Sequence, residues 1–287
     1  MAAASARADE IYAALRSAGG DADVVVLHSA LVPLGLRPER LKDDFLTALL
    51  RLVDDGTTLA LLSFTFSFCA IGWYHERLSR PETGTLSEWL FGSGTAVRTR
   101  HPVYSFLVAG PLTDRLLDTS DRDAFGPRTI FERFDDLHAR IVMAGNSWQW
   151  CTQVHRYEEV AGVPYRHHMY FGGIAKYGAG WEAACPRLCV RDSLLDSTLN
   201  FSVLFRQLSG AGAIAATPLG RGSVQGIATD VLRERCLALL ERDPFILLDR
   251  PREIERRLAE RGYVGSVAPP RVRADNTDWT LEPSLGA

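Results

Sequence analysis

Residues 152–159 contain a histidine and two glutamates at a spacing that suits acid–base chemistry. If the segment is helical, His155 lies one turn from Glu158 and Glu159 on the same face. A carboxylate beside an imidazole fixes the tautomer of the ring and stabilises the imidazolium, which a general base requires. The alternative is a surface His–Glu pair of small energetic value, and the spacing alone favours that alternative.

A second polar segment, residues 98–106, has the sequence RTRHPVYSF and precedes an apolar stretch. Its two arginines, one histidine and three hydroxyl side chains can donate hydrogen bonds to phosphate oxygens. The segment therefore indicates an anion site that includes Arg98, His101 and Ser105. A polar loop that leads into a strand is the alternative, and by spacing alone it is favoured.

The five cysteines are scattered along the chain and odd in number. This pattern is typical of reduced thiols and indicates a cytoplasmic protein. Cys151 lies four residues before His155 and is a candidate nucleophile, although a buried, inert thiol is the favoured interpretation. Cys185 and Cys189 have a spacing that zinc could use, but no second pair follows at a suitable distance. We expect no metal site.

Composition and missing motifs exclude several classes of protein. The 32 basic and 35 acidic residues give a net charge of −3, which argues against a nucleic-acid partner. The apolar stretches are too short to cross a membrane, and residues 1–15 have no apolar core of a secretion signal. No P-loop, GxSxG or HExxH motif occurs, and residues 220–226 miss the dinucleotide-binding spacing by one residue. We expect a turn and a strand there.

Alternating helix and strand signals predict the elements that position these residues. Ser5 is expected to cap a helix over residues 5–17, and Pro38 to begin a helix that ends near residue 53. Apolar runs predict strands at 23–27, 57–66, 141–145, 170–176 and 188–191, and helices are expected at 201–208, 228–241 and 252–261. This order favours an α/β sheet covered by helices. We predict one domain over residues 1–265 with a long loop at 69–94, and a poorly packed tail at 266–287.

Taken in order, four segments resemble the aminoglycoside 3-N-acetyltransferase family, the antibiotic N-acetyltransferases. These segments are HSALVPLG at 28–35, LSFTF at 62–66, RTRHPVYSFLVAG at 98–110 and TQVHRYE at 152–158. The resemblance runs from about residue 23 to 175. It implies a central mixed sheet with helices on both faces, acetyl-CoA as the co-substrate, and a small primary amine as the acceptor.

Three further segments are similar to a branch of that family that acetylates nucleotide-linked amino sugars or biosynthetic intermediates. They are TGTLSE at 83–88, FGPRTIF at 125–131, and GVPYR at 162–166 followed by FGG at 171–173. The chain departs from the branch at Ala30, in its aromatic residues at 144–150 and at Met169. An amino sugar is therefore the first expectation for the acceptor, and an aminoglycoside antibiotic is the second. Aromatic faces that could stack on a sugar are offered by Trp73, Tyr74, Trp89, Trp148 and Trp150.

Joined with the residue chemistry, the resemblance assigns His155 as general base and Glu158 as the residue that orients it. His101 is the second candidate, either as a base or as a ligand of donor phosphate. Donor binding is expected at two stretches and a strand end: His28, Ser29, Leu31, Leu34 and Gly35; Thr65 and Phe66; Arg98, Ser105 and Phe106. A homodimer is left open. The competing hypotheses are an acyl-enzyme or hydrolytic mechanism through Cys151, and a CoA-binding protein without turnover.

Overall fold

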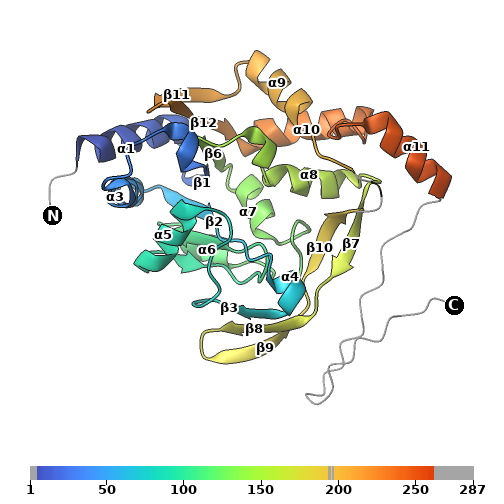
Figure 1. Ribbon diagram of the computed structural model, residues 1–287, viewed down its shortest axis with the longest axis horizontal. Helices are drawn as coiled ribbons and strands as arrows, with labels where there is room; N and C mark the ends of the chain where they lie inside the picture. Colours follow the sequence, from blue (N-terminus) through green and yellow to red (C-terminus); the bar gives the residue numbers. More distant parts are fainter. Residues whose placement is uncertain (1–4, 193–194, 196, 262–287) are drawn as a thin grey trace.

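A seven-stranded mixed sheet forms the centre of the molecule (Figure 1). The computed structural model describes residues 5–192, 195 and 197–261, and the strand order is β11-β12-β6-β1-β2-β5-β4. β1 is parallel to both β2 and β6, and the other neighbours are antiparallel. The strands are β1 (Val24–Ser29), β2 (Thr58–Leu62), β4 (Val97–Arg98), β5 (Phe106–Ala109), β6 (Arg140–Ala144), β11 (Ala215–Leu219) and β12 (Gly222–Ala228).

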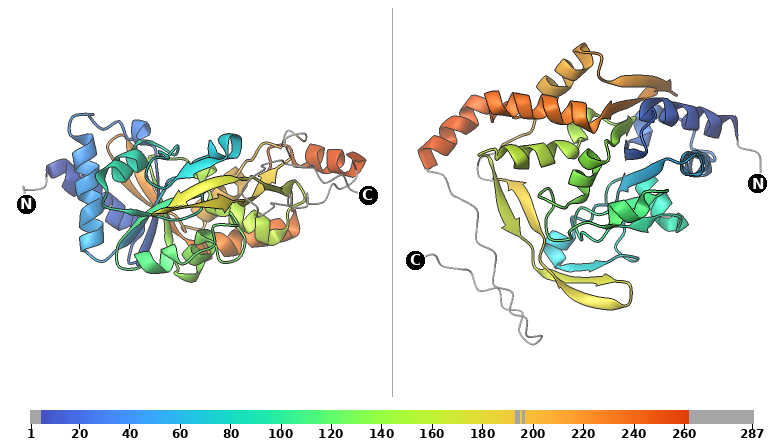
Figure 2. Two further views of the ribbon diagram at one scale, coloured as in Figure 1. Left: turned by 90° about the horizontal axis from the view of Figure 1, so that it is seen from below. Right: turned by 180° about the vertical axis from the view of Figure 1, so that it is seen from behind.

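Helices cover both faces of this sheet, as the sequence predicted (Figure 2). Successive residues of β1 point to opposite faces, so Val25 packs in a core with residues of α1 (Ala6–Gly19), α3 (Leu41–Asp54) and α5 (Thr85–Ser93). Val24 and Val26 pack in the other core, with residues of α7 (Ile130–Asp136), α8 (Gln153–Ala161), α9 (Ser202–Gly210), α10 (Thr229–Arg242) and α11 (Pro251–Arg261). Across the described residues, no helix has the length and apolar character needed to span a bilayer.

A smaller β unit extends from the helices toward the lower edge of Figure 1. β3 (Trp73–His75), β8 (Gly173–Tyr177) and β9 (Gly180–Ala184) form one sheet, and β7 (Arg166–Tyr170) pairs with β10 (Arg187–Arg191) in another. The short helices α2 (Leu31–Leu34), α4 (Phe68–Ile71), α6 (Thr113–Leu117) and η1 (Trp148–Trp150) connect the larger elements. β7 follows α8 directly and therefore links the two units.

Most predicted elements are found, with four corrections. The strand expected at 57–66 is β2, Thr58–Leu62, and it ends four residues earlier than predicted. The Ser5 side chain accepts a hydrogen bond from the Ala8 amide at 3.1 Å and caps α1, as expected. α3 begins at Leu41 rather than at Pro38, because Arg40 is left-handed with φ 61°. The expected loop at 69–94 contains β3 and α5, and the expected strand at 170–176 is divided between β7 and β8. The predicted tail at 266–287 lies outside the described residues, and the single domain stays a prediction.

The parallel strands β1, β2 and β6 bring their carboxyl ends to one edge of the sheet, where α/β proteins bind ligands. Gly145 follows β6 at this edge with φ 65°, and its amide donates to the Ser223 carbonyl. A Cβ on Gly145 would collide with the Ala30 carbonyl oxygen and lie 2.7 Å from Leu34 Cγ. The close approach of the turn after β1 to the turn after β6 therefore requires glycine.

Replacing Gly145 tests this close approach against a matched control. Gly162 has nearly the same φ, 64°, but no atom lies within 4 Å of its added Cβ. We expect Gly162→Ala to lower the free energy of unfolding by about 1 kcal/mol, the cost of the left-handed conformation alone. Gly145→Ala should lower it by at least about 1 kcal/mol more, because backbone must also move. Urea unfolding measures both, and equal losses would contradict the packing argument.

Candidate active site

Glu158 is a buried carboxylate on α8 that is surrounded by three donors. Its side chain has no exposed surface. Tyr165 Oη donates to Oε1 at 2.7 Å, and Arg166 Nη2 donates to Oε2 at 2.8 Å. The His155 ring lies 2.6 Å from Oε2 through Nδ1. Since a buried charge is stable only when it is paired and hydrogen-bonded, these three residues hold Glu158 in its ionised form.

The proton between His155 and Glu158 belongs to the imidazole. The pKa of Glu158 is lowered to about 2: burial alone would raise it, but the Arg166 guanidinium and the His155 hydrogen bond outweigh burial. An ionised carboxylate has no proton to donate, so Nδ1–H donates to Oε2. Arg166 Nη2 also lies 2.9 Å from Nδ1. Its hydrogen bond goes to Glu158 Oε2, the same oxygen that accepts from His155 Nδ1. The lone pair of the ring is therefore on Nε2.

The surroundings of His155 keep its ring neutral. Burial and the positive charge of Arg166 lower the pKa of His155, and the contact with Glu158 only partly opposes them. One fifth of the His155 side chain is exposed. A neutral imidazole with an oriented Nδ1–H and a free lone pair on Nε2 is the form that accepts a proton from a reacting group.

Two aromatic rings flank His155, and one of them, Phe201, lines a cavity. The Phe125 ring lies 5.6 Å from the imidazole and the Phe201 ring lies 5.9 Å from it, both in edge contact. Phe201 lines a cavity of about 430 Å³ at the carboxyl end of β6. On the other side, Gly126 packs against Arg187, which lines a cavity of about 740 Å³ under β9 and β10.

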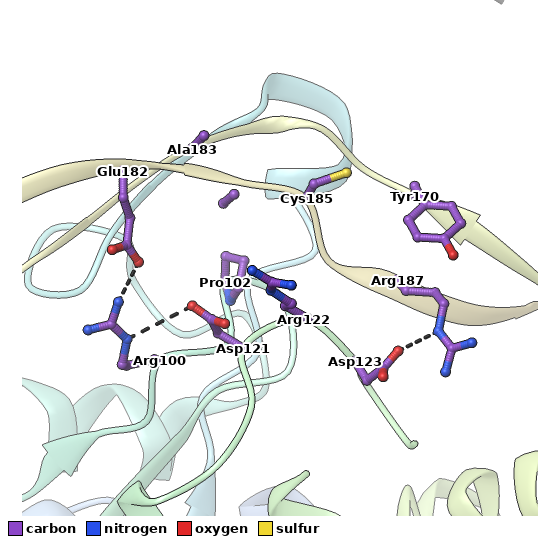
Figure 3. A pocket seen from close by; sticks show the side chains of 11 residues that line it. Arg100, Pro102, Asp121, Arg122, Asp123, Tyr170, Glu182, Ala183, Cys185 and Arg187 are labelled. Atoms are coloured by element: carbon purple, nitrogen blue, oxygen red, sulfur yellow. Dashed lines mark hydrogen bonds and ion pairs between the residues drawn. The ribbon is translucent and has the colours of Figure 1, made fainter. Parts of the chain in front are cut away.

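The larger cavity has a balanced set of charges (Figure 3). Arg100 contacts Glu182 and lies 3.9 Å from Asp121, and Arg187 contacts Asp123. The walls also contain Arg122, Tyr170 and Cys185. Three basic and three acidic side chains thus line this cavity, so its field favours neither cations nor anions strongly.

His101 lies near the same aromatic row but does not contact His155. Its Nδ1 accepts hydrogen bonds from the Val103 and Tyr104 amides at 3.1 and 2.9 Å. Burial lowers its pKa to about 3. The rings of Tyr104 and Phe125 stand between the two histidines, with successive centroid distances of 5.9, 4.9 and 5.6 Å. The geometry therefore makes His101 a loop-stabilising residue, not a support for His155 or a neutral-pH base.

Arg98 and Ser105 are also used inside the protein, contrary to the phosphate contacts that the sequence suggested. Arg98 is buried, and its nitrogens donate to Ser105 Oγ, to Thr65 Oγ1 and to the carbonyl oxygens of Ser63, Ser79 and Glu76. Ser105 Oγ donates to the Ser63 carbonyl at 2.6 Å. Phe106 is fully buried between Phe64, Phe131 and Phe134. These residues position the strand ends, because their polar groups have partners and the ring is in the core.

The remaining donor-site candidates divide by exposure. Phe66 is 47% exposed, and Ser29 and Leu31 are half-buried at the carboxyl edge of the sheet. Leu34 is fully buried, and Thr65 is buried with its hydroxyl bonded to Arg98. His28 is buried, and burial lowers its pKa to about 3. Gly35 is left-handed with φ 59°, and the Arg221 guanidinium lies over its Cα.

Cys151 cannot act as the proposed nucleophile in this arrangement. The residue is fully buried, and burial raises the pKa of its thiol to about 12. The thiolate is the reactive form of cysteine, so this side chain is inert near neutral pH. Cys151 therefore does not supply a nucleophile that His155 could activate to form an acyl-enzyme.

Comparisons with known proteins identify the family of this chain. The family described as aminoglycoside 3-N-acetyltransferase matches residues 26–224, which is more than half of the chain. The chain belongs to this family. It is an acyl-CoA-dependent N-acetyltransferase, with acetyl-CoA as co-substrate, as the resemblance implied.

Solved structures of similar proteins share the fold. The apoenzyme of aminoglycoside acetyltransferase AAC(3)-IVa is 19% identical with a TM-score of 0.68, over 87% of this chain and 96% of that chain. AAC-IIIb in its binary complex with CoASH is 15% identical with a TM-score of 0.68, over 83% and 97%. The YokD protein from Bacillus subtilis is 14% identical with a TM-score of 0.68, over 81% and 92%. A comparison with curated protein sequences found no match.

Two residues of this candidate site were not given a role from sequence. Tyr165 and Arg166 lie in the GVPYR segment, which resembled the family without indicating chemistry. They reach Glu158 because Gly162 ends α8 in a left-handed turn and the chain then reverses direction into β7. One sequence signal could have indicated these contacts: Tyr165 and Arg166 follow Glu158 by seven and eight residues, with Gly162 between Glu158 and Tyr165.

The ionisation of Glu158 predicts how stability depends on pH. A carboxyl whose pKa is lowered on folding stabilises the protein above its unfolded pKa, and this contribution disappears as pH falls through the folded value. We expect Glu158→Gln to lower the free energy of unfolding by on the order of 3 kcal/mol at pH 7. The difference from the unmodified protein should shrink between about pH 5 and pH 2, and urea unfolding across this range measures it.

Glu253 provides the control for this experiment. It pairs with Arg250 at the exposed surface of α11, with 37% of its side chain accessible. Glu253→Gln should change stability by less than about 1 kcal/mol at every pH. Parallel pH curves for the Glu158→Gln variant and the unmodified protein would show that folding does not lower the pKa of Glu158.

Proposed function

We propose that His155 removes a proton from the acceptor amine during acetyl transfer, with Glu158 and Arg166 holding it neutral and oriented. The observation that carries this proposal is the Nδ1 contact of 2.6 Å to a buried, ionised carboxylate. Amines of the acceptor class have pKa values of about 8 to 10 and are mostly protonated at neutral pH. A base positioned at the reacting nitrogen is therefore needed to supply a lone pair.

The reaction is a direct aminolysis of the thioester. The amine nitrogen bonds to the acetyl carbonyl carbon, and the carbon–sulfur bond breaks as the tetrahedral intermediate collapses. His155 Nε2 takes the proton that the nitrogen loses and returns a proton to the leaving CoA sulfur. The burial and raised pKa of Cys151 favour this single displacement over an acyl-enzyme.

We place the donor at the carboxyl ends of β1 and β2. Ser29, Leu31 and Phe66 offer accessible surface there, and the turn after β1 presents backbone groups at the same edge. Thr65, Leu34 and Gly35 shape this surface through their packing, with His28 beneath it. This assignment keeps the predicted donor region. In it, Arg98, Ser105 and Phe106 do not contact the donor but position the strand ends around it.

For the acceptor we favour an amino sugar with few positive charges, such as a nucleotide-linked one. The cavity beside Phe201 is lined by the stacked rings of Trp148 and Phe205, 4.8 Å apart, and by amide and hydroxyl side chains. Arg206 is the charged residue among those that line it, and none of its described lining residues is a carboxylate. Aromatic faces and neutral polar groups suit a sugar, and the cation suits a phosphate.

An aminoglycoside antibiotic is the second candidate, because the family match is equally consistent with it. A polycationic acceptor requires an excess of carboxylates around its site. Neither described cavity has such an excess, which supports the first candidate.

Removing the imidazole tests the chemical step. General bases contribute about 10²–10⁴-fold, so His155→Ala should reduce kcat by about that factor in an assay of CoA thiol release. Glu158→Gln should cost less, and the double variant should lose little more than His155→Ala because the pair acts as a unit. His138→Ala on the surface is the control, since that ring contacts only Asp230 among described side chains. A folded His155→Ala variant with near-normal kcat would refute the assignment, and thiol release that needs no amine would favour hydrolysis.

Substitution in the sugar-like cavity tests the acceptor. Arg206 is exposed on α9, so Arg206→Gln should leave folding intact. We expect KM to rise about tenfold for a nucleotide-linked amino sugar, through loss of a charge-assisted hydrogen bond, while KM for acetyl-CoA stays unchanged. Arg235→Gln on α10 is the matched exposed control. A kcat/KM for kanamycin- or gentamicin-type amines well above that of any nucleotide amino sugar would reverse the preference.

A further inference from the structure

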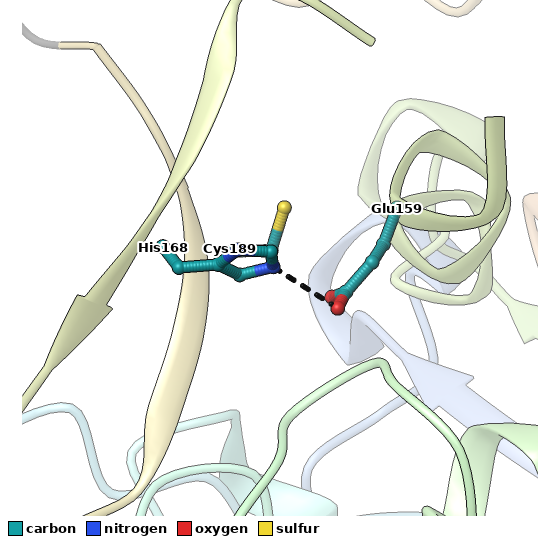
Figure 4. A group of neighbouring side chains, drawn as sticks. All are labelled: Glu159, His168 and Cys189. Atoms are coloured by element: carbon teal, nitrogen blue, oxygen red, sulfur yellow. Dashed lines mark hydrogen bonds and ion pairs between the residues drawn. The ribbon is translucent and has the colours of Figure 1, made fainter. Parts of the chain in front are cut away.

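Three metal-ligating side chains meet beside the catalytic pair without taking part in its contacts (Figure 4). Glu159 comes from α8, His168 from β7 and Cys189 from β10. His168 and Cys189 are direct partners in the antiparallel β7–β10 register, so their side chains share one face. Glu159 faces them from the helix, and the three candidate ligand atoms lie within 4.8 Å of one another.

We infer that Glu159, His168 and Cys189 form a binding site for a zinc ion. Imidazole nitrogen, thiolate sulfur and carboxylate oxygen are the ligand types that zinc prefers, whereas magnesium and calcium avoid sulfur. Tetrahedral zinc with ordinary bond lengths separates a nitrogen and an oxygen ligand by about 3.3 Å. His168 Nε2 and Glu159 Oε1 are 3.2 Å apart. Three protein ligands leave the fourth position for water.

The charges around the cluster balance when zinc is bound. The Cys189 thiol gives its proton to solvent on coordination, so one thiolate and one carboxylate neutralise the two positive charges of the metal. Arg187 Nη2 lies 3.3 Å from Glu159 Oε1 and competes for that oxygen. The same guanidinium already donates through Nε to Asp123, which neutralises it. Arg187 therefore has a second partner when Glu159 turns to the metal.

The backbone segments that carry these three ligands are held in place by the contacts of Arg166 and Glu158. Arg166, two residues before His168, donates through Nη1 to the Cys189 carbonyl at 2.9 Å, and Glu159 is the neighbour of buried Glu158. Both strands and the helix are thus held in place before any ion arrives, which lowers the cost of ordering the ligands. Cys185, the other cysteine of the sequence pair, lines the 740 Å³ cavity and is not a member of the cluster.

Zinc titration of the full chain tests the site. Protein stripped with a chelator is titrated with zinc chloride against a chromogenic competitor, and we expect one tightly bound zinc per chain. His168→Gln and Cys189→Ser should each weaken binding at least about 100-fold, because loss of a direct ligand exceeds the usual loss for an outer-sphere partner. His167→Gln and Cys185→Ser are the matched controls and should bind as the unmodified protein does. Circular dichroism confirms that each variant is folded.

Two further measurements remain decisive if Cys189→Ser is unstable. With cobalt as the probe, the unmodified protein and Cys185→Ser should show thiolate-to-metal charge-transfer absorption, and Glu159→Gln should weaken the binding. Arg187→Gln should tighten zinc binding because it removes the competitor for Glu159. Zinc affinity that is unaffected by His168→Gln and Glu159→Gln, or that is lost in Cys185→Ser, overturns the inference, whatever the acetyltransferase activity.

Discussion

The arrangement around His155 depends on one constraint, a fully buried negative charge at Glu158. A carboxylate without water needs donors on both oxygens, and the chain supplies them from Tyr165, Arg166 and His155. These come from a helix, the turn after it and the first residue of β7. The smaller β unit must therefore pack against α8, and the position of the imidazole follows from the same contacts.

A second buried carboxyl, Asp135, shows how the distance to a guanidinium affects the pKa of its neighbour. Asp135 is also largely buried, but Arg156 Nε lies 3.6 Å away; burial raises the pKa of Asp135 to about 6 despite bonds from Tyr157 and Gln153. Glu158 has Arg166 in direct contact and stays ionised. The shorter contact of Arg166 is therefore one reason why the pKa of Glu158 is lowered whereas the pKa of Asp135 is raised.

Local features of the site could be predicted from sequence, and contacts between distant segments could not. His155 and Glu158 were found because three residues of helix bring them together whatever the rest of the fold does. Tyr165 and Arg166 approach Glu158 only after the chain reverses at Gly162, and spacing does not encode that reversal. The central strands were predicted for a similar reason: an apolar run indicates a buried strand without reference to its partners.

Burial explains why the phosphate contacts that the sequence suggested are not available in the structure. Arg98 and Ser105 have the donor groups of a phosphate site, but their surroundings direct every bond inward. The structure gives this segment a role in positioning the strand ends. The expected loop at 69–94 was wrong for a different reason, because β3 is defined by its pairing with β8, about one hundred residues away in sequence.

Arg166 reconciles two requirements on the proposed general base that otherwise conflict. A carboxylate beside a histidine orients the ring but raises its pKa, which would leave an imidazolium unable to accept a proton near neutral pH. Arg166 lies against both groups, so its charge keeps Glu158 ionised and lowers the pKa of His155. Orientation and neutrality are thus obtained together. A divalent cation at Glu159, one residue further along α8, would act on the imidazole with the same sign, so the inferred zinc site and the base would be linked through charge as well as through the shared strands.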